Sequence, residues 1–312
     1  MAKQTLDPGL GEKLGGNLRR IINIDGSYNV HRTNVPLSAF NPYTFLISTT
    51  WTRFFSIIAL GFVLINIFFA LVYLVCGLEN LKGAESPSVM SPFLSTFYFS
   101  IHTFTTVGYG NISPYGIITN SVTIIEIFVG LLYVALITGL LYGRFSRPKA
   151  KLVYSKNMII APHNGGKAIM FRVANLRDNI MMELSADVLC MIRTEENGKT
   201  GRKYHNMELD RKSVIMLPTT WTLVHPITED SPMYGKSITE LKELEFQVII
   251  LIKGFDDTFS QTVHSRFSYT ADDIIDGGKF VLSYHTREDG VIEFDMDKIH
   301  QYETVEAEQL KS

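Results

Sequence analysis

Two long runs without charged side chains constrain the fold of this 312-residue chain more than any other feature. The first covers Phe54 to Leu78, 25 residues that as a helix span about 37 Å, enough to cross a hydrocarbon core of about 30 Å with some tilt. The second covers Ile117 to Tyr142 and contains one ionisable side chain, Glu126. The sequence therefore predicts two membrane-spanning helices.

A shorter apolar segment lies between these runs and is too short to cross a bilayer. It runs from Pro92 to Thr105, and Pro92 after Ser91 is a typical helix start. We predict a re-entrant helix at 92–105 whose carboxyl end points its negative dipole toward a central cavity and favours a cation there.

A pentapeptide follows that helix directly: Thr106, Val107, Gly108, Tyr109 and Gly110. The two glycines reach backbone angles closed to other residues, so successive carbonyls can point to one side. Such carbonyls can replace the hydration shell of a potassium ion, and the Thr106 hydroxyl can add a ligand. We predict a potassium-selectivity filter at 106–110, with K⁺ held at Thr106, Val107, Gly108 and Tyr109. The alternative, a chance turn in a surface loop, is disfavoured by the flanking apolar segments.

Beyond Pro148 the sequence becomes polar, with alternating or β-branched runs that predict an all-β sandwich. Asn164-Gly165-Gly166 and Asn197-Gly198 are expected turns between strands. The predicted organisation is a cytoplasmic amino-terminal segment (1–36), an interfacial helix (37–50), a pore domain (51–147, with spans at 54–78 and 117–142) and a cytoplasmic sandwich (148–312).

Basic residues flank the two spans on their outer sides, which places both termini in the cytoplasm and the chain in the cell membrane. They are Arg19, Arg20, Arg32 and Arg53 before the first span, and Arg144, Arg147, Lys149 and Lys151 after the second. Because one chain cannot surround an ion with carbonyls, a homotetramer is required. No Walker motif, nucleophile elbow or metal cluster is present, so we expect no enzyme activity, no organic cofactor and no nucleic-acid partner.

Three residues of the second span invite functional hypotheses. Glu126 is costly to bury in hydrocarbon, and we expect it to pack against the pore helix near His102 or Thr103 and support the filter. Gly130 and Gly139 could let the helix bend. Close helix packing is the alternative role for both glycines. The sequence favours a hinge over packing at Gly130 and does not separate the two roles at Gly139.

The whole chain resembles the inward-rectifier potassium channel family, and its prokaryotic branch in particular. The resemblance covers roughly residues 37 to 295 and rests on the filter and on three cytoplasmic signatures: Phe171 to Arg177, His225-Pro226-Ile227 leading to Ser231 to Tyr234, and Ser260 to Val263 leading to Arg266 and Tyr269. It implies an immunoglobulin-like sandwich, four copies of which extend the pore into the cell.

Helical spacing puts Ile127, Leu131, Val134, Thr138 and Tyr142 along one face of the second span. The resemblance assigns this face to the cavity and makes Tyr142 the constriction, where four large side chains can exclude water. Strongly rectifying relatives carry an acid where this chain has Val134, so we expect weak rectification. His102 and Ile112 stand where many members have a Glu–Arg pair, and we expect His102 to support the filter, either as a structural histidine or through a hydrogen bond behind it.

Trp51 and Arg53 mark a membrane boundary, and Arg144, Arg147 and Lys149 form a basic cluster at headgroup level that attracts anionic lipid. The resemblance implies contact with phosphoinositides, although plain positive-inside topology also explains the charges. Two other functions compete with a potassium channel. One is a non-conducting lipid or ligand receptor, and the other is a less selective cation channel, since Asn111 and Ile112 follow the filter.

Overall fold

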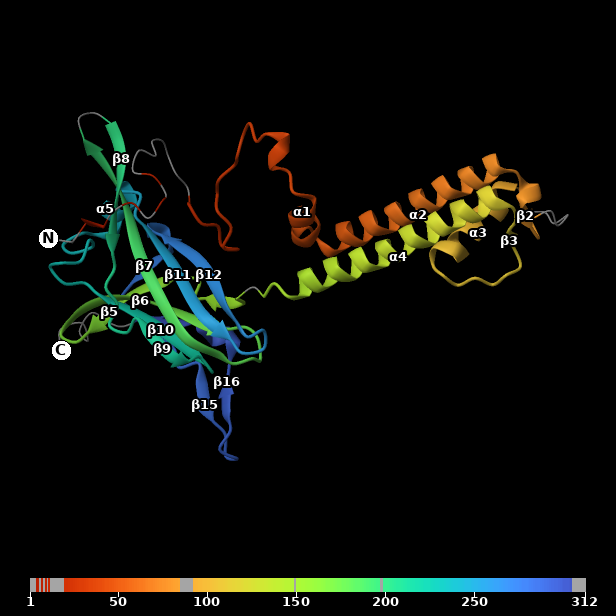
Figure 1. Cartoon of the computed structure of the whole chain (residues 1–312). Coiled ribbons are helices and arrows are strands. Elements are labelled where there is room, and N and C mark those ends of the chain that lie inside the picture. Colours follow the sequence, from red (N-terminus) through yellow and green to blue (C-terminus); the bar gives the residue numbers. More distant parts are fainter. Residues whose placement is uncertain are drawn as a thin grey trace. The chain divides into compact units, whose positions relative to one another are not determined.

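The computed structural model describes residues 4–5, 7, 9, 11, 20–84, 92–148, 150–196 and 199–304. The chain forms two compact units (Figure 1). A helical unit contains residues 34–147, and a β-rich unit combines residues 1–33 with 148–312.

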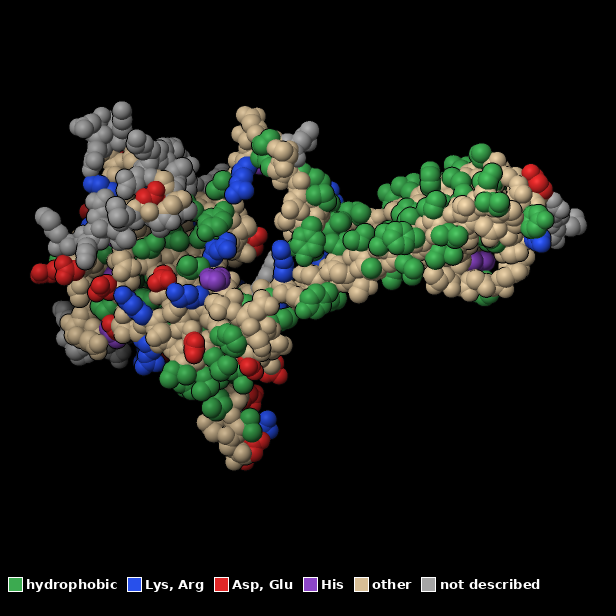
Figure 2. Space-filling model, in the orientation of Figure 1, with side chains coloured by type: hydrophobic (Ala, Val, Ile, Leu, Met, Phe, Trp, Pro, Cys, Tyr) green, Lys and Arg blue, Asp and Glu red, His purple; other side chains and the backbone are tan. Residues whose placement is uncertain are grey.

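In its described residues, 34–84 and 92–147, the helical unit contains four α-helices and a two-residue strand pairing. The elements are α1 (Pro42–Ser48), α2 (Trp51–Cys76), β2 (Leu81–Lys82), α3 (Pro92–Phe104), β3 (Ser113–Pro114) and α4 (Ile117–Phe145). Two of them, α2 and α4, are long and apolar enough to cross a membrane. On the face shown in Figure 2, hydrophobic side chains cover these two helices and charged ones gather at the ends of the unit.

The helix boundaries differ from the predicted ones for local reasons. The first span starts at Trp51 because Thr50 is the last residue with extended backbone angles, and it ends at Cys76 because Gly77 has a φ of 91°. The interfacial helix is shorter than predicted. It begins at Pro42, where the Asn41 side chain accepts a hydrogen bond from the Thr44 N–H at 3.1 Å, and Leu37–Ala39 forms a separate 3₁₀ turn.

The β-rich unit is built from two main sheets. The six-stranded sheet runs β1-β8-β7-β11-β12 with β9 beside β7, and the five-stranded sheet runs β10-β6-β5-β13 with β4 beside β6. The strands are β1 (Gln4–Thr5), β4 (Leu152–Tyr154), β5 (Met158–His163), β6 (Gly166–Asn175), β7 (Met181–Glu196), β8 (Lys199–Asn206), β9 (Ser213–Met216), β10 (Thr220–Pro226), β11 (Gln247–Asp256), β12 (Gln261–Thr270) and β13 (Ile274–Asp276).

Smaller elements complete this unit. They are α5 (Ile238–Glu243), the pair β14 (Gly278–Phe280) and β17 (Tyr302–Thr304), and the hairpin β15 (Tyr284–Thr286) and β16 (Ile292–Phe294). Alternate residues of both main sheets form one buried core, including Phe171, Val188, Leu223 and Ile250. The two-sheet, β-rich architecture predicted from the alternating runs is confirmed.

The expected turn at Asn164-Gly165 joins β5 to β6, with φ of 48° and 76°. Positive φ at both central residues is what a tight hairpin turn requires, and Asn followed by Gly supplies it at low cost. The other expected turn, Asn197-Gly198, lies outside the described residues.

The amino-terminal segment packs on the β-rich unit. Ile21 and Ile22 are buried against Met191, Tyr204 and Ile249. The Ser268 hydroxyl donates to the carbonyl of Ile22 at 2.6 Å.

Candidate ion-conduction site

The filter backbone is anchored to the carboxyl end of the pore helix α3. The N–H groups of Val107 and Gly108 both donate to the carbonyl of His102, at 2.9 and 3.2 Å, and the Thr106 N–H donates to the Thr103 carbonyl at 3.0 Å. These bonds satisfy helix carbonyls that would otherwise lack partners. They also direct the N–H groups of Thr106, Val107 and Gly108 toward the pore helix.

Three of the five filter residues have left-handed backbone angles. The φ values are 59° at Thr106, 59° at Gly108 and 80° at Gly110. A Cβ added at either glycine would have no neighbour within 4 Å in the single chain, so glycine is needed here for conformation and not for space. The strained angle at Thr106 was not predicted, because threonine gives no sequence signal for it.

His102 contacts the filter through its ring. The His102 and Tyr109 rings meet edge to face, with centroids 4.8 Å apart at 90°. In the described part of the chain the imidazole has no side-chain hydrogen bond behind the filter, so this contact is an aromatic one. The ring fixes the position of Tyr109 by packing.

Glu126 lies at the centre of a buried polar cluster and is itself fully buried. Its carboxyl oxygens contact the Ser100 hydroxyl at 2.5 Å and the Tyr73 hydroxyl at 2.6 Å. Ser100 also contacts Asn66 of α2, at 3.0 Å. Glu126 therefore reaches the pore helix at Ser100 and not at the expected His102 or Thr103.

Asn66, Tyr73 and Ser100 are not among the site residues predicted from the sequence. Asn66 and Tyr73 lie inside an otherwise uncharged span, and a buried amide or phenol there needs a partner. That is the signal that could have identified them, although it does not say which partner they find.

The two glycines of α4 have different surroundings. A Cβ on Gly130 would lie 2.3 Å from the carbonyl oxygen of Phe104, whereas a Cβ on Gly139 would meet nothing within 4 Å. Gly130 therefore packs closely against the backbone of Phe104, which is the alternative to a hinge at this position. Gly139 has no packing requirement in the single chain.

The predicted cavity face is exposed in the single chain. Ile127, Leu131, Val134 and Tyr142 are 38%, 57%, 58% and 74% exposed, and Thr138 is exposed as well. The buried residues of the same helix are Thr119, Thr123, Glu126 and Gly130, and they lie in its first half. The face is thus available to another molecule, although exposure alone does not distinguish a pore from lipid.

Arg144 is engaged inside the helical unit. Its two terminal nitrogens donate to the carbonyls of Leu46 at 2.5 Å and Thr49 at 2.7 Å, and its guanidinium lies 4.4 Å from the Trp51 ring centroid and 4.6 Å from that of Phe54. Its Nε is buried and has no partner among the described residues. Arg144 therefore joins α4 to α1 and the start of α2 within the helical unit.

The remaining members of the predicted lipid set are exposed where they are described. Trp51, Arg53 and Arg147 are exposed, and the Arg53 guanidinium lies 5.0 Å from the Phe45 ring centroid. Lys149 lies outside the described residues.

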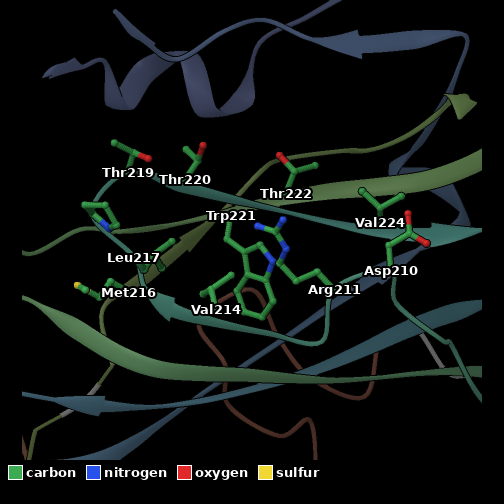
Figure 3. Close-up of a pocket in the computed structure, with 11 residues that line it drawn as sticks. Asp210, Arg211, Val214, Met216, Leu217, Thr219, Thr220, Trp221, Thr222 and Val224 are labelled. Carbon is green, nitrogen blue, oxygen red and sulfur yellow. The ribbon is translucent and has the colours of Figure 1, made fainter. Parts of the chain in front are cut away.

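The β-rich unit has a pocket of about 500 Å³ beside Trp221 (Figure 3). The residues that line it belong to β9, to β10, to the loop between these strands and to the segment before β9. Three of them are threonines: Thr219, Thr220 and Thr222. The Trp221 indole N–H is buried without an acceptor among the described residues. None of the predicted site residues lines this pocket, and in the described ranges no cluster of His, Cys, Asp or Glu could hold a metal ion.

A pore helix between two spans, a filter anchored to it and an appended β-rich domain define a potassium channel with two spans per chain. Comparison with known proteins agrees. Residues 60–147 match the family described as "Ion channel", and residues 152–312 match "Inward rectifier potassium channel C-terminal domain".

Three curated relatives show the same kinship. The chain is 34% identical over 287 residues to Inward rectifier potassium channel Kirbac3.1 of Paramagnetospirillum magnetotacticum, covering 90% of this chain and 95% of that protein. It is 28% identical to ATP-sensitive inward rectifier potassium channel 12 of Gallus gallus (84% and 66% covered) and 27% identical to G protein-activated inward rectifier potassium channel 2 of Pongo abelii (92% and 73%).

The chain belongs to the inward-rectifier potassium channel family. It is a membrane protein with two spanning helices, an ion channel and not an enzyme.

Proposed function

We propose that four copies of this chain form a passive potassium pathway whose filter is Thr106 to Gly110. The arrangement of the filter backbone carries the proposal. The N–H groups of Thr106, Val107 and Gly108 bond to the carboxyl end of α3, and the left-handed angles of Thr106, Gly108 and Gly110 support an arrangement in which successive carbonyls face one side. With four copies, such carbonyls surround a dehydrated K⁺ on all sides.

An apolar recess in the helical unit supports the homotetramer. It has a volume of about 530 Å³, lies between α2 and α4 below the end of the pore helix, and includes Phe62, Phe104, Tyr133 and Val134 in its lining. A single chain leaves this surface open, and a neighbouring copy offers an apolar helix of matching character in its own α4.

We place the gate at Tyr142 and the bend that opens it at Gly139. Tyr142 lies in the last turn of α4 and is 74% exposed, so it is free to meet its counterparts in other copies. The open space around Gly139 permits movement there, whereas Gly130 is held against the backbone of Phe104.

Anionic phospholipid, phosphoinositide included, is the proposed regulator. Arg53, Arg147 and Lys149, with Trp51 as an interfacial anchor, are the residues we assign to it, and Arg144 is left out because its donors are used within the chain. Weak rectification is proposed because the exposed face of α4 presents Val134 where strong rectifiers carry an acid.

The experiment is potassium efflux from liposomes that contain the purified channel, with sodium outside and with or without anionic phosphoinositide. The proposal predicts K⁺-selective efflux that Gly108→Ala abolishes and that lipid alters through Arg147. Sodium flux equal to potassium flux would support a less selective cation channel. No flux under either lipid condition, while labelled lipid still binds, would support a non-conducting receptor.

A further inference from the structure

The buried cluster behind the filter links three helices through four oxygen–oxygen contacts. Asn66 and Tyr73 come from α2, Ser100 from α3, and Thr123 and Glu126 from α4. The contacts are Asn66 Oδ1 to Ser100 Oγ at 3.0 Å, Ser100 Oγ to Glu126 Oε1 at 2.5 Å, Glu126 Oε2 to Tyr73 Oη at 2.6 Å, and Tyr73 Oη to Thr123 Oγ1 at 3.1 Å. Each contact needs one hydrogen between its two oxygens.

The orientation of the Asn66 amide fixes where the Ser100 hydrogen goes. The Asn66 Nδ2 donates to the carbonyl of Phe62 at 2.8 Å, so Oδ1 faces Ser100. An amide oxygen only accepts, so the hydrogen in that contact belongs to Ser100. The opposite orientation of the amide is excluded. In that orientation Oδ1 would face the Phe62 carbonyl oxygen at the same short distance, with no hydrogen between the two oxygens.

A serine hydroxyl has one hydrogen, and Ser100 has given it to Asn66. The 2.5 Å contact between Ser100 and Glu126 therefore needs a hydrogen from Glu126. Tyr73 supplies the hydrogen to the other carboxyl oxygen of Glu126, and the Thr123 hydroxyl shares its hydrogen between Tyr73 at 3.1 Å and the Thr119 carbonyl at 2.9 Å. No cation among the described residues forms an ion pair with Glu126, and an uncompensated buried carboxylate is very costly.

We propose that Glu126 is a neutral carboxylic acid that donates a hydrogen bond to Ser100, and that Asn66, Ser100 and Tyr73 are positioning residues for the potassium filter. These hydrogen bonds fix the position of the pore helix relative to α2 and α4. They act at Ser100, six residues before Thr106. Because the acid is neutral, it holds the helix without placing a fixed negative charge behind the filter. This inference rests on the proposed role of Thr106 to Gly110 in conduction.

A pair of substitutions at Glu126 separates a neutral donor from a carboxylate. The amide of Glu126→Gln accepts from Tyr73 with its oxygen and donates to Ser100 with its nitrogen, so all contacts keep a hydrogen. Glu126→Leu removes both functions and leaves Ser100 and Tyr73 with buried unmet groups. We expect K⁺ efflux of Glu126→Gln within about twofold of the native channel, and loss of about tenfold or more in Glu126→Leu.

A second pair tests the hydroxyl at position 100. Ser100→Ala removes the link between Asn66 and Glu126, whereas Ser121→Ala removes an exposed hydroxyl of α4 that bonds only to its own helix, at the Ile117 carbonyl. We expect lower potassium-over-sodium selectivity in Ser100→Ala and native behaviour in Ser121→Ala.

Infrared spectroscopy detects the proton on the Glu126 carboxyl group without a measurement of ion flux. The native protein at neutral pH should show a carbonyl stretch of a protonated carboxylic acid that is absent in Glu126→Gln. Absence of this band, together with a Glu126→Gln channel as impaired as Glu126→Leu, would mean that Glu126 is ionised and would overturn the inference. Because the band is measured on protein that need not conduct, this failure is distinct from a failure of the proposed channel.

Discussion

Gly130 gives a prediction whose magnitude follows directly from the structure. A Cβ at this position would lie 2.3 Å from the Phe104 carbonyl oxygen, 3.1 Å from its carbon and 3.3 Å from its Cα. Real Cβ contacts do not fall below about 3.0 Å, so α4 and the end of the pore helix must separate by roughly 0.7 Å in Gly130→Ala. Overpacking against backbone of this kind costs about 1–3 kcal/mol.

Gly139→Ala is the matched control, since it makes the same change in the same helix where nothing lies within 4 Å. Both variants gain the same helix propensity, up to about 1 kcal/mol, so their difference isolates the contact with Phe104. We expect Gly130→Ala to be less stable than Gly139→Ala by about 1–3 kcal/mol per chain.

Thermal unfolding of the purified channel, followed at a fixed scan rate, measures the difference, and K⁺ efflux shows whether it reaches the filter, because Phe104 is the last residue of α3. Equal unfolding midpoints and equal efflux for the two variants would refute the packing role of Gly130.

Three further predictions follow. Arg144→Lys keeps the charge but loses two carbonyl bonds and the aromatic contacts, so it should lower the unfolding midpoint and leave the response to anionic lipid intact. Arg147→Gln should leave the unfolding midpoint unchanged and weaken the response to anionic lipid. Identical lipid dose responses for the two variants would contradict this. Tyr142→Ala should raise the efflux of the unstimulated channel, and unchanged resting efflux would place the gate elsewhere. Burial lowers the pKa of His225, whose Nε2 contacts Ser231 at 2.9 Å. As the pH falls below about 6.5, the unfolded chain takes up a proton at this histidine before the folded chain does, so the folded state loses stability. Unfolding midpoints should fall with pH in this range, and His225→Asn should weaken the dependence.

Much of the fold could be predicted because its determinants are local. Uncharged length predicted both spans, with boundaries off by no more than three residues, and Asn164-Gly165 predicted a hairpin turn from backbone preference alone. The positive φ values of Gly108 and Gly110 agree with the prediction, because glycine is the residue that adopts them most readily.

The interactions that depend on three-dimensional neighbours could not be predicted in the same way. The sequence shows that Glu126 must avoid hydrocarbon, but helix rotation decides that it meets Ser100 and Tyr73. Arg144 illustrates a second limit: helix carbonyls and lipid phosphates both accept its hydrogen bonds, so only the position of α1 distinguishes them. The same holds for Gly130, because a packing glycine and a hinge glycine look alike in a sequence.

We propose that the backbone carbonyls of residues 106–110 select potassium over sodium. The most direct test is the reversal potential across a planar bilayer containing the purified channel, with potassium on one side and sodium on the other. We expect a reversal potential far from zero and in the direction of potassium selectivity, with the selectivity lost in Gly108→Ala because an L side chain at its φ of 59° costs about 1–2 kcal/mol and favours another backbone conformation. A reversal potential near zero in the native channel would contradict it.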